Sequence, residues 1–151
     1  MNTITAKNAA KQDFMPLMRE LVRAYQAFAL FDAQLHRLAG SGLTVSQADV
    51  IFTLGNTPGM SCGEIGERTL ITKGTLTGVL DRLVQKGLIK RSKDPRDGRS
   101  TRISLTAKGQ RVFEREFPRQ VAAIKQRFDR LSPAQRKRGL ALLREIRSVF
   151  E

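Results

Sequence analysis

Basic side chains gather between residues 88 and 105, and their chemistry suits the binding of phosphate groups. Arginine offers a rigid fork of N–H donors that matches phosphate oxygens, and lysine offers a compact positive charge. The basic residues of this segment are Lys90, Arg91, Lys93, Arg96, Arg99 and Arg102. Only Asp94 and Asp97 oppose them. We therefore expect this segment to meet a polyanion.

The charge of the whole chain supports the same expectation. Its 151 residues include 27 Lys and Arg against 14 Asp and Glu, for a net charge of +13. This excess favours a polyanionic partner over a surface charged only for solubility. Lipid is a poorer partner, because no basic amphipathic helix has a free apolar face and charges interrupt every apolar run. We expect a cytoplasmic protein without a signal peptide or membrane contact.

Residues for catalysis or metal binding are too few to form a site. His36 is the single histidine and Cys62 the single cysteine, and they lie far apart along the chain. They allow no Ser/His/Asp or Cys/His set, no metal cage and no intrachain disulfide. Gly55, Gly59 and Gly63 lack the Lys-Ser/Thr pair that completes a phosphate-binding loop. We expect no enzyme activity, no metal and no cofactor.

Two short helices are predicted just before the basic segment. Ser61 and Glu64 have the spacing of a capping box, in which each residue satisfies a backbone N–H near the other. This pair predicts a short helix through 65–69. Thr72 is then placed to cap a second helix with Lys73 in its first turn.

The second helix has one apolar face and one small, polar face. At 100° per residue, one face carries Leu76, Val79, Leu80 and Leu83. Gly87 ends the helix, because glycine readily adopts the left-handed conformation of a helix C-terminus. This amphipathic pattern predicts that the apolar face packs on a core and leaves the other face free.

The free face of this helix has two glycines at its centre. It consists of Gly74, Gly78 and Asp81, flanked by Lys73, Thr75, Thr77 and Arg82. Glycine inside a helix costs about 1 kcal/mol relative to alanine. We infer that the backbone lies close to a groove floor and that the flanking residues read the bases. Asp81 alone would repel phosphate, so we expect it to pair with Arg82 or with a basic residue of the following hairpin.

The basic segment itself reads as a two-stranded hairpin. Residues 88–93 and 100–105 have strand patterns, and the second alternates as a half-buried strand does. Between them, 94–99 is rich in turn-forming residues. Helix, turn, helix and a hairpin with a basic tip together indicate a winged helix-turn-helix that reads double-stranded DNA.

Long amphipathic helices are predicted on both sides of this region. From Phe14 onward, apolar residues recur at alternating spacings of four and three, as in a helix packed on other helices. They are Leu17, Leu21, Ala24, Phe28, Phe31, Leu35 and Leu38. Gly40-Ser41-Gly42 ends this helix. The first twelve residues show no periodicity, and we expect a frayed tail.

Three further helices are predicted from their capping residues, Thr44, Thr106 and Ser132. Thr44 and Ser132 are each followed by Gln three residues later, as in a capping box. Pro118 predicts a bend in the helix that Thr106 opens, because proline removes a hydrogen-bond donor and clashes with the preceding turn. The first, fifth and last helices carry more apolar stripe than the winged region needs. They serve either to cover that region within one chain or, as we favour, to form a dimer.

The motifs of the central region are specific enough to identify a family. They are Thr72-Lys73-Gly74-Thr75-Leu76-Thr77, Asp81-Arg82-Leu83, Lys86-Gly87-Leu88-Ile89, Asp94-Pro95-Arg96-Asp97-Gly98-Arg99 and Leu105-Thr106-Ala107-Lys108-Gly109. In these motifs the chain resembles the MarR family of bacterial transcription regulators. The resemblance implies a mainly α fold with a small β-wing. It further implies one MarR-like domain over 1–151, with a winged helix-turn-helix at 44–105 between dimerisation helices at 13–39 and 107–151.

The resemblance also implies how DNA is contacted. Arg99 would enter the minor groove, with Arg96 as a second candidate, and Asp97 would hold the wing arginine in position. The competing interpretation of Asp97 is a simple turn former beside Gly98. Many MarR relatives carry an arginine where this chain has Gly78, so base contacts there do not transfer. The predicted DNA-binding residues are Lys73, Thr75, Thr77, Arg82, Lys90, Lys93, Arg96, Asp97 and Arg99.

By the same resemblance, a small ligand, often an aromatic acid, or oxidation of a thiol releases the DNA. The candidate ligand-binding residues are Tyr25, Phe28, Phe31, His36, Phe52 and Phe113, with Phe117 nearby and Arg23 or Arg37 as counter-ion. Aromatic residues at helical spacing are more often plain core. Cys62 lies at a helix N-terminus, which favours a thiolate. However, thiol-sensing relatives carry their reactive cysteine in the first long helix.

The sequence therefore predicts a homodimeric repressor, bound to a pseudo-palindromic operator and released by a small aromatic ligand. Two alternatives stay open. One is an architectural DNA-binding protein with little sequence preference and no effector, and the other is a redox-sensing regulator that uses Cys62.

Overall fold

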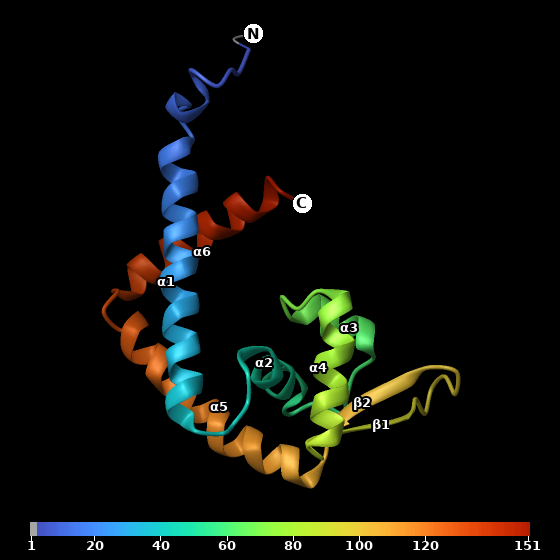
Figure 1. Cartoon of the computed structure of the whole chain (residues 1–151). Coiled ribbons are helices and arrows are strands. Elements are labelled where there is room, and N and C mark those ends of the chain that lie inside the picture. The colour runs from blue at the N-terminus through green and yellow to red at the C-terminus, as the bar shows by residue number, and fades with distance from the viewer. Residues whose placement is uncertain (1–2) are drawn as a thin grey trace. The chain divides into compact units, whose positions relative to one another are not determined.

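The computed structural model describes residues 3–151 and is mainly helical, with a single two-stranded antiparallel sheet among those residues (Figure 1). The predicted fold class is confirmed. The chain divides into two units, one ending at Val45 and one spanning Ser46–Glu151. The prediction of one domain over 1–151, with its internal boundaries, stays a prediction.

The first unit holds a 3-10 turn, η1 (Ala9–Lys11), and the long helix α1 (Met15–Ala39). Gly40, with φ of +63°, ends α1 as predicted. The tail that we expected to fray instead contains η1, just before which Asn8 Oδ1 accepts the backbone N–H of Thr5 at 2.8 Å. Met1 and Asn2, which belong to the same expectation, lie outside the described residues.

The second unit begins with three helices around a shared core: α2 (Val45–Leu54), α3 (Cys62–Arg68) and α4 (Lys73–Gln85). The apolar face predicted for α4 is buried at all four positions. It packs among the other large buried side chains of this unit, which include Ile51, Leu54, Ile65, Ile89 and Ile103. The winged region is therefore built on one continuous apolar core.

Most of the predicted helix starts have the expected hydrogen bonds. Ser61 with Glu64 at α3, and Ser132 with Gln135 at α6 (Pro133–Ser148), form complete capping boxes. Thr106 Oγ1 accepts the N–H of Gly109 at the start of α5 (Ala107–Phe128). α5 continues through Pro118, and the bend expected there stays a prediction. The cap predicted from the Thr44 side chain also stays a prediction.

One predicted cap is wrong. Thr72 precedes α4, but its side chain accepts no backbone N–H. Its hydroxyl donates to the Thr75 hydroxyl at 3.1 Å, and only the Thr72 carbonyl accepts N–H groups of the first turn. The helix starts where expected because its apolar face is buried, without help from a side-chain cap.

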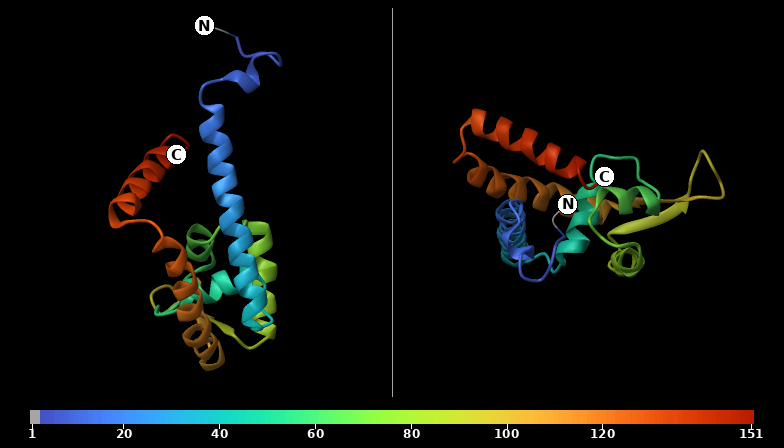
Figure 2. Two further views of the ribbon diagram at one scale, coloured as in Figure 1. Left: turned by 90° about the vertical axis from the view of Figure 1, so that its left-hand side faces the viewer. Right: turned by 90° about the horizontal axis from the view of Figure 1, so that it is seen from above.

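The C-terminus of α4 leads directly into the hairpin. Gly87 has φ of +68°, its N–H donates to Val84 O, and the next N–H, of Leu88, donates to Leu83 O. This pair of bonds is the Schellman ending of a helix. β1 (Ile89–Lys93) then pairs with β2 (Thr101–Leu105), with Arg91 opposite Ile103. The hairpin projects away from α2–α4 (Figure 1 and the right view of Figure 2).

The start of α5 is joined tightly to this corner. The Thr106 hydroxyl donates to Gly87 O at 2.6 Å, and the Thr106 N–H donates to Leu88 O at 3.0 Å. Lys108 Nζ donates to Lys86 O. A Cβ on Gly109 would overlap the Leu88 carbonyl, so only glycine allows the first turn of α5 to approach this closely.

Candidate nucleic-acid interface

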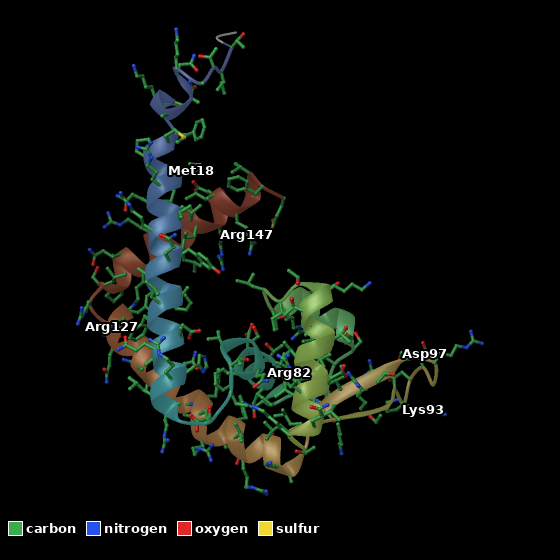
Figure 3. All side chains as sticks on the ribbon, viewed as in Figure 1. Met18, Arg82, Lys93, Asp97, Arg127 and Arg147 are labelled. Atoms are coloured by element: carbon green, nitrogen blue, oxygen red, sulfur yellow. The ribbon has the colours of Figure 1, made fainter. Side chains whose placement is uncertain are left out.

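Two adjacent aspartate turns shape the tip of the hairpin. Asp94 Oδ1 accepts the backbone N–H of Arg96 at 2.8 Å, and Asp97 Oδ1 accepts the backbone N–H of Arg99 at 3.0 Å. Each arginine is thus held through its backbone by an aspartate two residues earlier, as in an Asx turn. Both arginine side chains are exposed. Figure 3 shows Asp97 at the far end of the hairpin.

The bonds of Asp97 match the turn-forming interpretation. Its carbonyl also accepts the N–H and the hydroxyl of Ser100, which closes the turn. Within the described residues, its carboxylate holds Arg99 by the backbone and has no hydrogen bond to the Arg99 guanidinium. A role of Asp97 in holding the wing arginine therefore acts through the main chain.

The exposed face of α4 carries the predicted reading residues. Lys73, Thr75, Thr77 and Arg82 are all exposed, and a Cβ on Gly74 or Gly78 would meet no atom within 4 Å. Lys90 and Lys93 are exposed on β1, and Figure 3 shows Lys93 on the hairpin and Arg82 on α4. The fold brings these basic and hydroxyl side chains to the solvent surface of neighbouring elements.

An ion pair joins the free face of α4 to the hairpin. Asp81 Oδ1 accepts from Arg91 Nη2 at 2.8 Å. Of the two partners considered for Asp81, the structure selects the one from the hairpin and not Arg82. The pair neutralises the Asp81 carboxylate on the exposed face of α4.

Arg102 does not lie among the exposed basic residues. Its guanidinium donates to Gly59 O at 3.1 Å and to Asp94 Oδ2 at 3.0 Å, and the Arg102 side chain is only 20% exposed. The backbone N–H of Arg96, and then the Arg102 guanidinium, hold the pKa of Asp94 below its ordinary value. This arrangement was not predicted from the sequence, because Arg102 and Gly59 lie 43 positions apart.

The net charge is spread unevenly along the chain. Residues 44–106 hold ten Lys and Arg against six Asp and Glu, whereas 107–151 hold twelve against five. More of the excess therefore lies on α5 and α6 than on the winged region. DNA binding is therefore indicated less by the total charge than by the exposed cations of the hairpin tip and of α4.

The candidate ligand residues fall into both units. In α1, Tyr25 and Phe28 are exposed, Phe31 is half-buried, and His36 is buried with Nε2 3.7 Å from Asp32 Oδ2. The second unit contains the rest of the set. Arg23, a proposed counter-ion, is paired with Glu20 at 2.9 Å.

Three aromatic residues of the second unit, Phe52, Phe113 and Phe117, form a cluster. The ring centroids of Phe52 and Phe117 lie 5.2 Å apart, and those of Phe113 and Phe117 lie 5.0 Å apart. Phe113 is buried, and a Cβ on Gly55 would overlap its ring. Phe113 is thus a core residue, whereas Phe52 is half-buried and Phe117 is partly exposed. A ligand-binding role for Phe52 and Phe113 stays a prediction.

Cys62 is a free, exposed residue at the first position of α3. Among residues 3–151, no three His, Cys, Asp or Glu side chains lie together as a metal ion would require. Within the same range, no helix is both long and apolar enough to span a membrane.

Comparison with known proteins identifies the family. The model of the MarR family matches residues 41–100. The structure of BpsR from Bordetella bronchiseptica, a protein described as regulated in DNA binding by 6-hydroxynicotinic acid, is 30% identical. It superimposes with a TM-score of 0.74 and covers 89% of this chain and 95% of its own. The chain belongs to the MarR family of transcriptional regulators.

Two curated relatives extend this finding. The HTH-type transcriptional regulator YkoM of Bacillus subtilis is 28% identical to this MarR-family regulator over 134 residues, which is 87% of this chain and 84% of YkoM. The homoprotocatechuate degradative operon repressor of Escherichia coli is 36% identical over 73 residues, covering 48% of this chain and 49% of the repressor. The resemblance inferred from the motifs is confirmed.

Proposed function

We propose that this MarR-family regulator is a homodimeric repressor that binds a pseudo-palindromic operator and is released by a small aromatic ligand. The observation that carries the DNA-reading part is the hairpin tip. Arg96 and Arg99 stand exposed on a turn fixed by two aspartates, at the end of a hairpin that follows the helix α4, and the free face of α4 is lined by Lys73, Thr77 and Arg82. In this mode the free face of α4 enters the major groove and the arginines enter the adjacent minor groove.

The dimer is supported by apolar surface that the single chain leaves exposed. No residue of α6 is buried, and its Leu140, Leu142 and Leu143 are each more than half exposed. α1 exposes Leu17 and Leu38, among other large apolar side chains. Patches of this extent on a monomer mark interaction surfaces. The interpretation that these helices merely cover the winged region does not explain why α6 stays uncovered.

The repressor and ligand parts of the proposal draw on the relatives. One relative is named a repressor, and BpsR is described as regulated by 6-hydroxynicotinic acid, an aromatic acid. We expect an aromatic carboxylate to act on this chain as well, with the α1 aromatic residues among its contacts.

Selection of bound sites from random DNA duplexes tests the proposal. We expect an inverted repeat with half-site centres about 10 base pairs apart, as for two lobes that read successive turns of one duplex face. Sedimentation should give a dimer. Titration with aromatic carboxylates, 6-hydroxynicotinic acid included, should release the selected duplex. A random-sequence competitor that displaces the selected site at equal concentration would instead indicate an architectural protein, since a regulator keeps on the order of 10³-fold preference.

A further inference from the structure

We propose that Arg102 is a positioning residue, which fixes the direction of the hairpin relative to α3 and α4 and does not itself contact DNA. The inference rests on the proposed function, because it concerns how the two tip arginines reach the minor groove. Arg102 belongs to the basic set of the hairpin by sequence, but its guanidinium is already engaged at two points.

The first point ties the hairpin to the turn before α3. Arg102 Nη1 donates to Gly59 O at 3.1 Å, across 43 positions of sequence. Next to it, the N–H of Met60 donates to Ile103 O at 2.9 Å and the N–H of Ile103 donates to Met60 O at 2.7 Å. Met60 thus pairs with the edge of β2 that β1 leaves free. Ser61, the capping residue of α3, follows directly.

Glycine is required for this approach. Gly59 has φ of +101°, and a Cβ there would lie 2.6 Å from Ile103 O and 3.0 Å from Arg102 Cγ. The turn before α3 therefore lies directly against β2. The Arg102 side chain crosses this contact, which explains why it is mostly covered.

The second point ties Arg102, near the tip end of β2, to the tip turn itself. Arg102 Nη2 donates to Asp94 Oδ2 at 3.0 Å, while Asp94 Oδ1 accepts the backbone N–H of Arg96 at 2.8 Å. The Asp94 carboxylate therefore bonds the mostly covered Arg102 through one oxygen and the tip turn through the other. The side chains of Arg102 and Asp94 are 20% and 16% exposed. Arg91, the other ion-paired arginine of the hairpin, is 41% exposed.

These bonds form one continuous connection from Gly59 through Arg102 and Asp94 to Arg96. Arg102 Nε is buried and has no hydrogen-bond partner among the described residues, so this side chain keeps no donor turned to solvent at that atom. Because its guanidinium is bonded to Gly59 O and to Asp94, Arg102 serves DNA binding by holding the tip turn in place. Its two-point fork is something a lysine, with one nitrogen, does not reproduce.

The test compares Arg102→Met and Arg102→Lys with Lys93→Met, which removes one charge from an exposed position of the same hairpin. The duplex is the one selected from random sequences. We expect both Arg102 variants to lose about tenfold in affinity, and the salt dependence of Arg102→Lys to keep the wild-type slope. If Arg102→Lys binds as tightly as wild type, the fork is not needed and the proposal is wrong.

A double-mutant cycle with Arg99→Gln separates positioning from contact. If Arg102 positions the tip, Arg99→Gln should cost at least about tenfold in the wild-type background and at most about threefold beside Arg102→Met. Beside Lys93→Met its cost should be unchanged. Additive losses for Arg102→Met, with a salt slope reduced by about one, would show that Arg102 contacts a phosphate.

Hydrogen exchange of the DNA-free protein tests the same connection without any ligand. The amides of Met60, Arg96 and Ile103 should exchange at least about tenfold faster in both Arg102 variants, while those of the α3–α4 core keep their protection. Unchanged exchange at all three amides would overturn the proposal. This measurement remains decisive even if no operator is found, in which case the proposed function fails by itself.

Discussion

Asp81 on the free face of α4 and Arg91 on β1 lie 2.8 Å apart, oxygen to nitrogen. The reading helix and the hairpin, which are expected to enter different grooves, are therefore linked by a charge pair at their exposed surfaces. The pair keeps the Asp81 carboxylate on the face of α4 that the proposed function places against DNA, which is itself a polyanion. We therefore expect Asp81 to serve specificity and hairpin placement more than affinity.

Asp81→Asn should therefore bind DNA of random sequence more tightly. The change removes a negative charge and releases Arg91, and we expect an affinity gain of about 2–5-fold with a smaller preference for the operator. The unfolding midpoint should hardly move, because an exposed pair contributes less than about 1 kcal/mol. Filter-binding with the selected operator duplex and with a random-sequence duplex measures the effect. Glu145→Gln, which removes the same charge from α6, should leave the preference unchanged.

Arg99→Ala should weaken operator binding by about 1–3 kcal/mol without unfolding the protein, because the side chain is exposed and its backbone N–H bond to Asp97 is kept. Fluorescence anisotropy with the selected duplex and a thermal melt are the two measurements. Arg111→Ala, an exposed arginine of α5, is the matched control and should bind as wild type. Equal affinities of Arg99→Ala and wild type would exclude the minor-groove role.

Operator binding should depend steeply on salt. If each protomer neutralises about four phosphates, the logarithm of the affinity should fall against the logarithm of salt concentration with a slope of roughly −7 for the dimer. The engagement of Arg91 and Arg102 within the protein limits the number of hairpin cations available for this. A slope steeper than about −12 would mean that the cations of α5 and α6 also bind phosphate.

Gly78→Ala should separate stability from binding. A Cβ at this position meets no atom within 4 Å, so the substitution should stabilise α4 by about 1 kcal/mol and raise the unfolding midpoint by about 2–4 °C. If the α4 backbone lies close to the groove floor, operator affinity should nevertheless fall. Gly139→Ala in α6 is the control, since its Cβ is equally unobstructed. It should add stability at unchanged affinity, with sedimentation confirming the same oligomer. Tighter operator binding by Gly78→Ala would refute the close approach.

The capping box of α3 should add a component to acid unfolding. The N–H of Ser61, followed by its hydroxyl, holds the pKa of Glu64 below its ordinary value of 4.5. A carboxylate with a lowered pKa stabilises the folded state above pH 4.5, and this contribution is lost as the pH falls through the folded-state pKa. Glu64→Gln keeps the capping geometry without the titration, so its stability profile should be flatter in that range. Identical profiles from pH 7 to 3 would contradict this assignment.

Much of the fold follows from short-range patterns. Local rules describe well the features that depend on residues within a few positions of one another. These features are the caps at Ser61, Thr106 and Ser132, the glycine at the end of α4 and the apolar face of α4. Thr72 shows where such rules end. Its type and position suit a cap, yet its hydroxyl donates to the hydroxyl of Thr75 and accepts no backbone N–H of the helix.

The sequence predicted which residues of the candidate site are exposed, but not which side chains of the site bond to one another. Exposure of the tip arginines follows from the turn-forming residues around them. The bond of Arg102 to Gly59 does not, because it spans 43 positions and depends on how the turn before α3 packs on β2. For the same reason the sequence left Asp81 with two possible partners, which only tertiary structure separates.

The contact between Gly109 and the Leu88 carbonyl has a mechanical consequence. The end of α4, the beginning of β1 and the first turn of α5 meet there through the bonds of Thr106 to Gly87 and Leu88, with no room for even one methyl group. We therefore expect any rotation of the first turn of α5 to turn the end of α4 and the start of the hairpin with it.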